Sequence, residues 1–237
     1  MADRPSWTRA LVNVGREALA FGRQAWLLRH DLEGAPASAE VRDGDDVVVL
    51  LHGLFATAGG LRPMRRAITR HKGVHAAAMT YPPGPGVEEL AERLAALASE
   101  LPGAARLHLV GHSLGGVVAR FYAQEAGDTR VVQTISMASP FAGVVGASAL
   151  GFGAARDLAP DSAVLRKIRL AASATANVPH LSIIAATDAV LRSPVSHALP
   201  GGEVIVMEGQ GHNTVLFDEE VARIVERRIL TRRRKTC

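Results

Sequence analysis

Short apolar runs alternate with amphipathic segments along most of this chain. The clearest run, Val47–Leu51, holds apolar residues only, which predicts a strand buried on both faces, as in a parallel sheet. Further strands are predicted at 75–81, 107–110, 131–137, 180–187 and 203–207, and helices at 61–72, 87–101, 117–123 and 214–230. This alternation predicts an α/β fold with a mostly parallel, doubly wound sheet and helices on both faces.

A separate amphipathic helix is predicted before the first strand, over residues 7–29. Its apolar residues recur at spacings of four and three and share one face: Trp7, Leu11, Val14, Ala18, Phe21, Ala25 and Leu28. This helix either docks on the domain, which we favour because such helices commonly cover a sheet, or lies on a membrane surface through its large apolar side chains. We therefore divide the chain into an N-terminal helix, residues 1–33, and a domain, residues 34–237.

The segment between the predicted strands at 131–137 and 180–187 breaks the alternation. Residues 141–177 are rich in Ala and Gly and contain one helical piece around 162–170. An insertion of this length is either a lid over a site or a buried connector that never opens, and both interpretations stay open. The segment also holds apolar side chains that would be costly to expose unless they cover something: Val144, Val145, Leu150, Phe152 and Leu158.

Composition narrows the class of protein. A chain of 237 residues with 48% hydrophobic and 21% charged residues fits one globular domain with a core of its own. Arginines interrupt the first helix, so the sequence predicts no signal peptide, and no window is apolar enough to span a bilayer. The expected location is cytoplasmic, with peripheral contact to a membrane left open. The single cysteine, Cys237, excludes a disulfide within the chain.

The net charge of +4 is concentrated in a basic C-terminal tail, Arg227–Lys235. We expect such a tail to be solvated, or to favour an anionic lipid surface. No aromatic residues alternate with its basic ones, so a nucleic-acid partner is not predicted. The sequence indicates no oligomeric state.

The candidate chemistry centres on Ser113. The predicted strand ends at Val110, the residues Gly111-His112-Ser113-Leu114-Gly115 follow, and a helix comes next. A G-x-S-x-G pattern between a strand and a helix is typical of a strained turn that holds a serine hydroxyl clear of the backbone. The alternative, that Ser113 only caps the helix, would be preferred without this context.

A serine nucleophile needs a base and a carboxylate that orients the base. The candidate base is His212, between the last strand and the last helix, and the candidate acid is Asp188, just after a strand. Because parallel strands end at one edge of the sheet, Ser113, Asp188 and His212 are expected to meet there. Glu208 is a rival acid, and Asp157 and Asp161 of the insertion are weaker ones. No metal-binding or nucleotide-binding pattern is present, so no cofactor and no metal are predicted.

These patterns together resemble a known family. Leu51-His52-Gly53-Leu54, the elbow around Ser113, Asp188 and Gly211-His212 are similar to the α/β-hydrolase family, in particular its small bacterial lipases and esterases, from about residue 47 to 229. The resemblance implies an oxyanion hole formed by the backbone N–H groups of Leu54 and Leu114, and a lid inserted late in the fold. The chain departs from those lipases at Ser139-Pro140-Phe141, where many have a proline followed by a histidine and a glycine, and in its N-terminal helix.

We therefore expect a serine hydrolase that cleaves carboxylic esters through a Ser-His-Asp triad and an acyl-enzyme, and among such esters we favour lipid-like ones. A thioesterase or an acyltransferase on the same fold is the first alternative, because all three reactions use the same acyl-enzyme. A non-catalytic, membrane-associated binding protein is the second.

Overall fold

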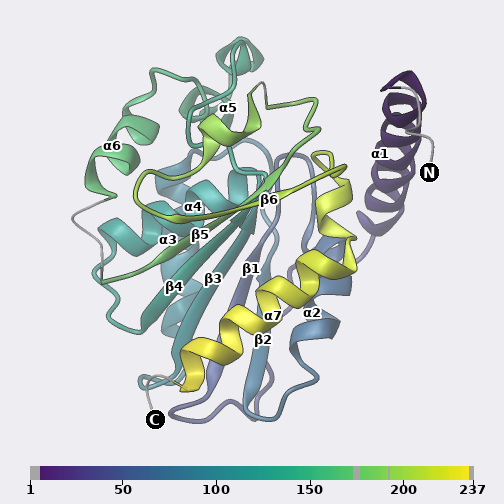
Figure 1. Ribbon diagram of the computed structural model, residues 1–237. Coiled ribbons are helices and arrows are strands. Elements are labelled where there is room, and N and C mark those ends of the chain that lie inside the picture. Colours follow the sequence, from purple (N-terminus) through teal and green to yellow (C-terminus); the bar gives the residue numbers. More distant parts are fainter. Residues whose placement is uncertain (1–5, 173–176, 192, 235–237) are drawn as a thin grey trace.

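The computed structural model describes residues 6–172, 177–191 and 193–234. At its centre, six parallel strands lie in the order β2-β1-β3-β4-β5-β6 (Figure 1). They are β1 (Asp46–Leu51), β2 (Val74–Met79), β3 (Arg106–His112), β4 (Val131–Met137), β5 (His180–Ala185) and β6 (Glu203–Met207). The sheet confirms the predicted doubly wound α/β architecture, and β1 is buried along its whole length, as its unbroken apolar run predicts.

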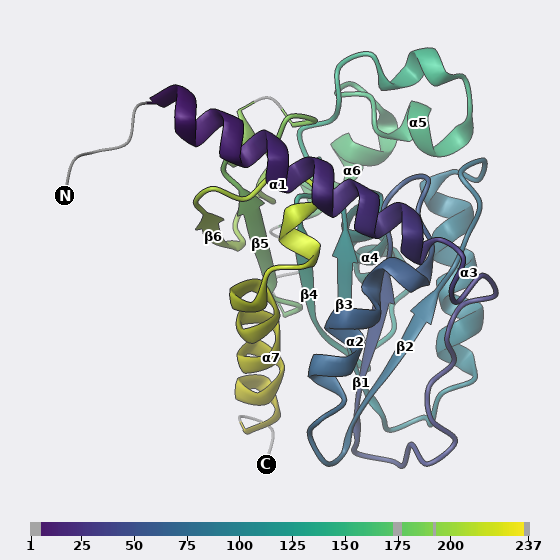
Figure 2. The same ribbon diagram turned by 90° about the vertical axis from the view of Figure 1, so that its right-hand side faces the viewer.

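Helices cover both faces of this sheet (Figures 1 and 2). One face carries α3 (Val87–Ser99), α4 (Leu114–Glu125) and α6 (Ala163–Ala171), and the other carries α2 (Arg62–Ile68) and α7 (Glu219–Arg234). Successive residues of β1 point to opposite faces, so Val47 and Val49 join the first core while Val48 and Leu50 join the second.

The last predicted helix, 214–230, is two helices in the structure. A short η4 (Thr214–Leu216) is followed by α7, which begins at Glu219 because the Asp218 carboxylate accepts the backbone N–H groups of Glu220 and Val221 at 2.8 and 3.1 Å. The helix predicted over 61–72 likewise divides into η1 (Ala58–Leu61) and α2.

The basic tail is not simply solvated, which corrects that part of the expectation. Its described residues continue α7 to Arg234. Arg228 forms an ion pair with Glu203 at 2.6 Å, and Arg233 forms one with the buried Asp46 at 3.3 Å. These pairs hold the end of α7 at the amino end of the sheet. The predictions about Lys235 and Cys237 lie outside the described residues.

The insertion packs against the domain along most of its described part. It contains η2 (Ala147–Leu150), α5 (Gly153–Asp157) and α6, of which only the last was predicted. The Asp157 carboxylate accepts the Val87 N–H at 2.7 Å at the start of α3, and Leu158 is buried, while Val145 is 84% exposed. That this segment moves as a lid stays a prediction, as does the domain division at residue 34.

Helix α1 (Ser6–Leu27) lies across the carboxyl end of the sheet (Figure 2). It docks, but not through the apolar face that the sequence pattern singles out. Within residues 11–27, the part of α1 whose burial the structure describes, Ala20 and Leu27 are buried, flanked by the half-buried Glu17 and Gln24. The predicted apolar face is largely exposed: Leu11, Val14, Ala18, Phe21 and Ala25.

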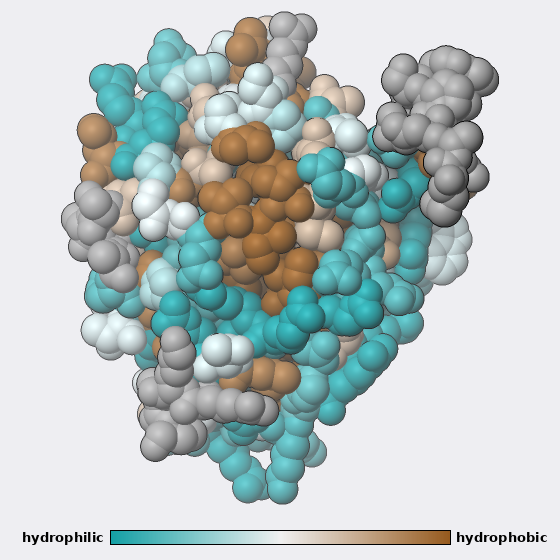
Figure 3. All heavy atoms as spheres, viewed as in Figure 1, coloured by the Kyte–Doolittle hydropathy of each residue, from teal (hydrophilic) through white to brown (hydrophobic). Residues whose placement is uncertain are grey.

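The edge of the sheet formed by β6 also carries apolar surface. Figure 3 shows apolar side chains gathered over β5 and β6, beside α7. Val204 and Val206 of β6, the edge strand, are partly exposed. Among the described residues, no helix combines the length and the apolar character that crossing a bilayer requires.

Candidate active site

Ser113 occupies a strained turn between β3 and α4. Its φ of 51° and ψ of −120° lie outside the regions that a residue with a side chain normally adopts. The flanking glycines explain how the turn fits: a methyl group on Gly111 would overlap the backbone of Gly115 and Gly116, and one on Gly115 would overlap the Leu51 carbonyl. The predicted strand, tight turn and helix around Ser113 are therefore present.

Asp188 and His212 are brought together from separate loops. Nδ1 of His212 lies 2.7 Å from Oδ2 of Asp188, while Oδ1 of Asp188 accepts the N–H groups of Val190 and Leu191 at 2.8 and 2.9 Å. Because a carboxylate only accepts, Nδ1 is the donor of this bond, and in the neutral imidazole the lone pair is therefore on Nε2. Nε2 has no hydrogen-bond partner in the part of the chain that the structure describes.

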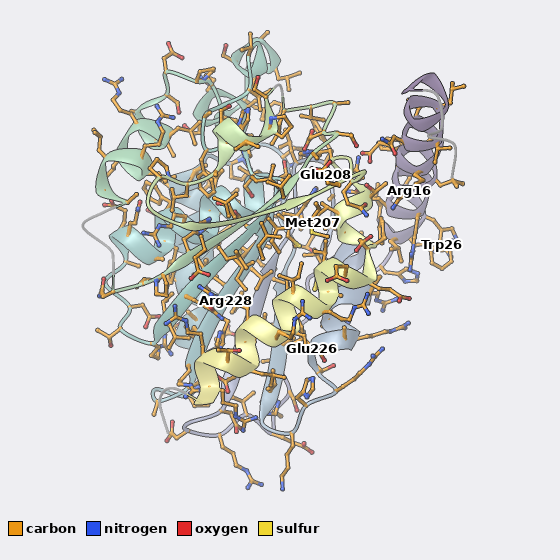
Figure 4. The ribbon with its side chains drawn as sticks, in the orientation of Figure 1. Arg16, Trp26, Met207, Glu208, Glu226 and Arg228 are labelled. Atoms are coloured by element: carbon orange, nitrogen blue, oxygen red, sulfur yellow. The ribbon has the colours of Figure 1, made fainter. Side chains whose placement is uncertain are left out.

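The rival acids lie elsewhere. Glu208 is exposed, and Figure 4 shows it on the segment after β6, towards the side of α1 that carries Arg16. The Asp157 carboxylate accepts the Val87 N–H at the start of α3. Of the carboxylates that the sequence offered, the one that contacts His212 is Asp188.

Two further histidines fix the loops of this site. Nε2 of His112 donates to the carbonyl of His212 at 2.8 Å, so the elbow holds the histidine loop directly. Nδ1 of His52 donates to the Gly53 carbonyl at 2.7 Å, and its Nε2 accepts the Tyr81 N–H at 3.1 Å. Burial lowers the pKa of His112 to about 3 and that of His52 to about 4, so both are neutral at pH 7.

His52 also supports the loop that carries Leu54. Its ring stacks on the Tyr81 ring with 3.9 Å between centroids, and the Tyr81 hydroxyl donates to the His52 carbonyl. Tyr81, which follows β2, thus holds the loop after β1 in place through His52. Tyr81 carries no sequence pattern that indicated this role.

Ser113 and His212 line one cavity of about 540 Å³, a volume typical of small-molecule sites. Leu54 lines it as well, whereas the Asp188 carboxylate lies behind His212. Most of the remaining wall comes from α1 and the insertion and is mostly apolar: Phe21 and Ala25 from α1, Leu28 directly after it, and Val144, Ala147, Leu150, Ala155 and Leu158 from the insertion. The contribution of α1 to the cavity was not predicted.

Sequence reasoning also missed Glu17, whose carboxylate contacts the loop that follows His212. One signal for it exists: Glu17 is the single acidic residue in a helix that contains three arginines. No group of three or more His, Cys, Asp or Glu side chains within the described residues could hold a metal ion.

Comparisons with known proteins agree with this architecture. A family model described as palmitoyl protein thioesterase matches residues 47–186, which include Ser113 but neither Asp188 nor His212. No curated protein matches the chain by sequence.

Solved structures of lipases and esterases are similar in fold. They include a structure reported for the metagenome-derived lipolytic enzymes LipS and LipT (TM-score 0.63, 17% identity, 86% of this chain and 99% of that one). Lipase BlEst2 of Bacillus licheniformis has a TM-score of 0.65 at 13% identity, over 81% and 96% of the two chains. Est1E of Butyrivibrio proteoclasticus has a TM-score of 0.58 at 15% identity, over 83% and 92%. The parallel sheet, the elbow and the family match together establish that this chain is an α/β-hydrolase and belongs to the palmitoyl protein thioesterase family.

Proposed function

We propose that this chain is a serine hydrolase that cleaves long-chain acyl esters, with Ser113 as nucleophile, His212 as base and Asp188 as the carboxylate that orients it. One observation carries the proposal. The Nε2 side of the His212–Asp188 pair, which has no hydrogen-bond partner among the described residues, and the strained Ser113 share the wall of one apolar cavity. Family membership and the fold shared with lipases and esterases support hydrolysis.

In the first half of the reaction, Oγ of Ser113 attacks the carbonyl carbon of the acyl group while its proton passes to Nε2 of His212. The N–H groups of Leu54 and Leu114 are the proposed donors to the oxyanion, since the latter begins helix α4. When the tetrahedral intermediate collapses, the leaving alcohol takes the proton from His212 and the acyl group stays on Ser113.

In the second half, His212 takes a proton from water, and the resulting hydroxide attacks the acyl carbonyl. The bond to Ser113 breaks, Oγ regains the proton, and a carboxylic acid leaves. Asp188 keeps the proton on Nδ1 of His212 throughout and stabilises the imidazolium that forms in each half.

A thioester is the second candidate substrate, with a thiol in place of the alcohol as leaving group. The family match favours it, because the family is described by thioester cleavage. The apolar walls fit a long acyl chain in either case.

The mouth of the cavity supports contact with lipid assemblies as part of this function. Exposed apolar side chains surround it, with Phe21 65%, Phe55 60% and Leu150 55% exposed. The end of α7 docks at the other end of the sheet, beside Asp46. We therefore limit the proposed membrane contact to α1 and the cavity mouth, and leave out the basic tail.

The test combines a fluorophosphonate probe with a panel of esters and thioesters graded by acyl length. The wild-type protein should be labelled and should turn over long-chain substrates, Ser113→Ala should lose both, and Ser148→Ala, an exposed serine of η2, should keep both. Equal labelling of Ser113→Ala would refute the assignment of the nucleophile. A wild-type protein that neither reacts nor turns over would favour the binding-protein alternative.

A further inference from the structure

Glu17 of α1 binds the loop that carries His212, through Asn213, which lies 196 residues later in the chain. Its Oε1 accepts the backbone N–H of Asn213 at 2.7 Å and the Asn213 side-chain amide at 2.8 Å, and its Oε2 accepts the N–H of Thr214 at 3.2 Å. A carboxylate that accepts backbone N–H groups forms charge-assisted hydrogen bonds, which are stronger than neutral ones.

The fit between Glu17 and the loop is close. A methyl group on Gly211 would overlap the Glu17 carboxylate, so glycine at this position lets the carboxylate approach the loop in its present geometry. The neighbouring Arg16 adds a hydrogen bond from its Nη1 to the Gly209 carbonyl at 3.2 Å. From the opposite side, His112 donates to the carbonyl of His212. The loop is therefore held between α1 and the elbow.

Helix α1 is itself fixed at its other end. The Thr57 hydroxyl lies within hydrogen-bond distance of the Leu28 and His30 carbonyls, at 3.3 and 3.2 Å. Gly59 of η1 packs so closely on the Leu27 carbonyl that a methyl group there would overlap it. Because η1 follows β1, the position of Glu17 is tied to the sheet.

We propose that Glu17 is a positioning residue for His212: through it, α1 fixes the His212 loop so that Nε2 faces Ser113. This inference rests on the proposed function of Ser113 and His212. Glu17 touches no reacting atom, and its effect passes through the backbone of residues 213 and 214. Misplacement of a catalytic group by about 1 Å can cost about a hundredfold in rate.

The test compares Glu17→Ala and Glu17→Gln with Leu19→Ala, a matched control on an exposed position of the same helix. The fluorophosphonate probe first counts the reactive sites, and kcat per reactive site and KM are then measured with a short, soluble ester. Glu17→Ala should lower kcat per site by about ten- to a hundredfold with little change in KM. Glu17→Gln, which keeps one acceptor oxygen, should fall between Glu17→Ala and wild type, and Leu19→Ala should match wild type.

A merely structural role for Glu17 gives another result, namely fewer reactive sites with an unchanged kcat per site, and would overturn the proposal. Amide hydrogen exchange separates this failure from a failure of the proposed function. Glu17→Ala should lose protection at the Asn213 and Thr214 amides whether or not the protein is a hydrolase. Unchanged protection at both amides would also overturn the proposal.

Discussion

The two ends of strand β3 each lie beside a buried histidine–aspartate pair. At the amino end, Nε2 of His108 contacts Oδ1 of Asp46 at 2.8 Å. At the carboxyl end, the elbow that carries Ser113 contacts the His212 loop through His112. There, Nδ1 of His212 contacts Oδ2 of Asp188 at 2.7 Å. By residue type and distance the two pairs are nearly the same.

They differ in what the second nitrogen of the imidazole meets. Nδ1 of His108 accepts the Gln133 amide at 2.8 Å, so both ring nitrogens are occupied. Burial lowers the pKa of His108. Burial also raises the pKa of the Asp46 carboxyl, but hydrogen bonds from His108 and Arg106 outweigh this and hold that pKa below its ordinary value. The amino-end pair is therefore structural, and the ionic partners of Asp46 are Arg106 and Arg233.

At the carboxyl end, by contrast, the second nitrogen of His212 has no partner among the described residues, and the ring lines a cavity beside a strained serine. The comparison teaches that a histidine–aspartate pair indicates a catalytic base only under two conditions. The imidazole nitrogen that does not contact the aspartate must have no hydrogen-bond partner, and it must face a space that a substrate can enter. Three predictions test this contrast.

Removing the carboxylate charge should separate the two pairs most sharply. Asp188→Asn should lower kcat by about 10⁴-fold, because the amide favours the wrong tautomer of His212. Asp46→Asn should instead lower the free energy of unfolding by about 3 kcal/mol, because it weakens a buried pair, and leave kcat per reactive site unchanged. Kinetics after titration with the probe and denaturant unfolding measure the two effects. Glu208→Gln is the control, and a large loss of kcat in that variant instead would identify Glu208 as the acid.

Narrowing the cavity should affect catalysis through acyl length. Ala147→Phe adds a ring to a residue that lines the cavity, whereas Ala149→Phe adds the same ring to an exposed residue of the same η2 helix. We expect Ala147→Phe to lower kcat/KM for long acyl esters about tenfold relative to short ones, and Ala149→Phe to leave the ratio unchanged. An equal ratio in both variants would contradict the assignment of this cavity to the acyl chain.

The smallest expected effect concerns contact with lipid. We expect this contact at the carboxyl end of the sheet, through the cavity mouth, and not along α7. In a Ser113→Ala background, Phe55→Ser should reduce co-sedimentation with vesicles containing anionic lipid about three- to tenfold. Arg227→Gln, an exposed position on α7, should change it much less. If only the arginine substitution matters, the contact lies along α7 and the proposal for the cavity mouth is wrong.

The sequence by itself determined the succession of strands and helices along the chain and the elbow at Ser113. These features depend on local chemistry: unbroken apolar runs such as Val47–Leu51 are stable only between two layers, and the glycines around Ser113 permit a turn that other residues would block. Asp188 and His212 could be named because residues after parallel strands must meet at one edge.

Only the tertiary structure decided how α1 docks and what the cavity contains. The apolar pattern of α1 singles out a largely exposed face. The helix packs instead through Ala20 and Leu27 and through hydrogen bonds that the Glu17 carboxylate accepts from backbone N–H groups. Such bonds depend on which loop the folded chain brings near. The helix sequence marks Glu17 as its single acidic residue, but it does not indicate that the partner is a backbone N–H almost 200 residues away. For the same reason, sequence alone cannot distinguish the structural His108 from the candidate base His212. Gln133, the partner of the second nitrogen of His108, reaches it only once β3 and β4 have paired in the sheet.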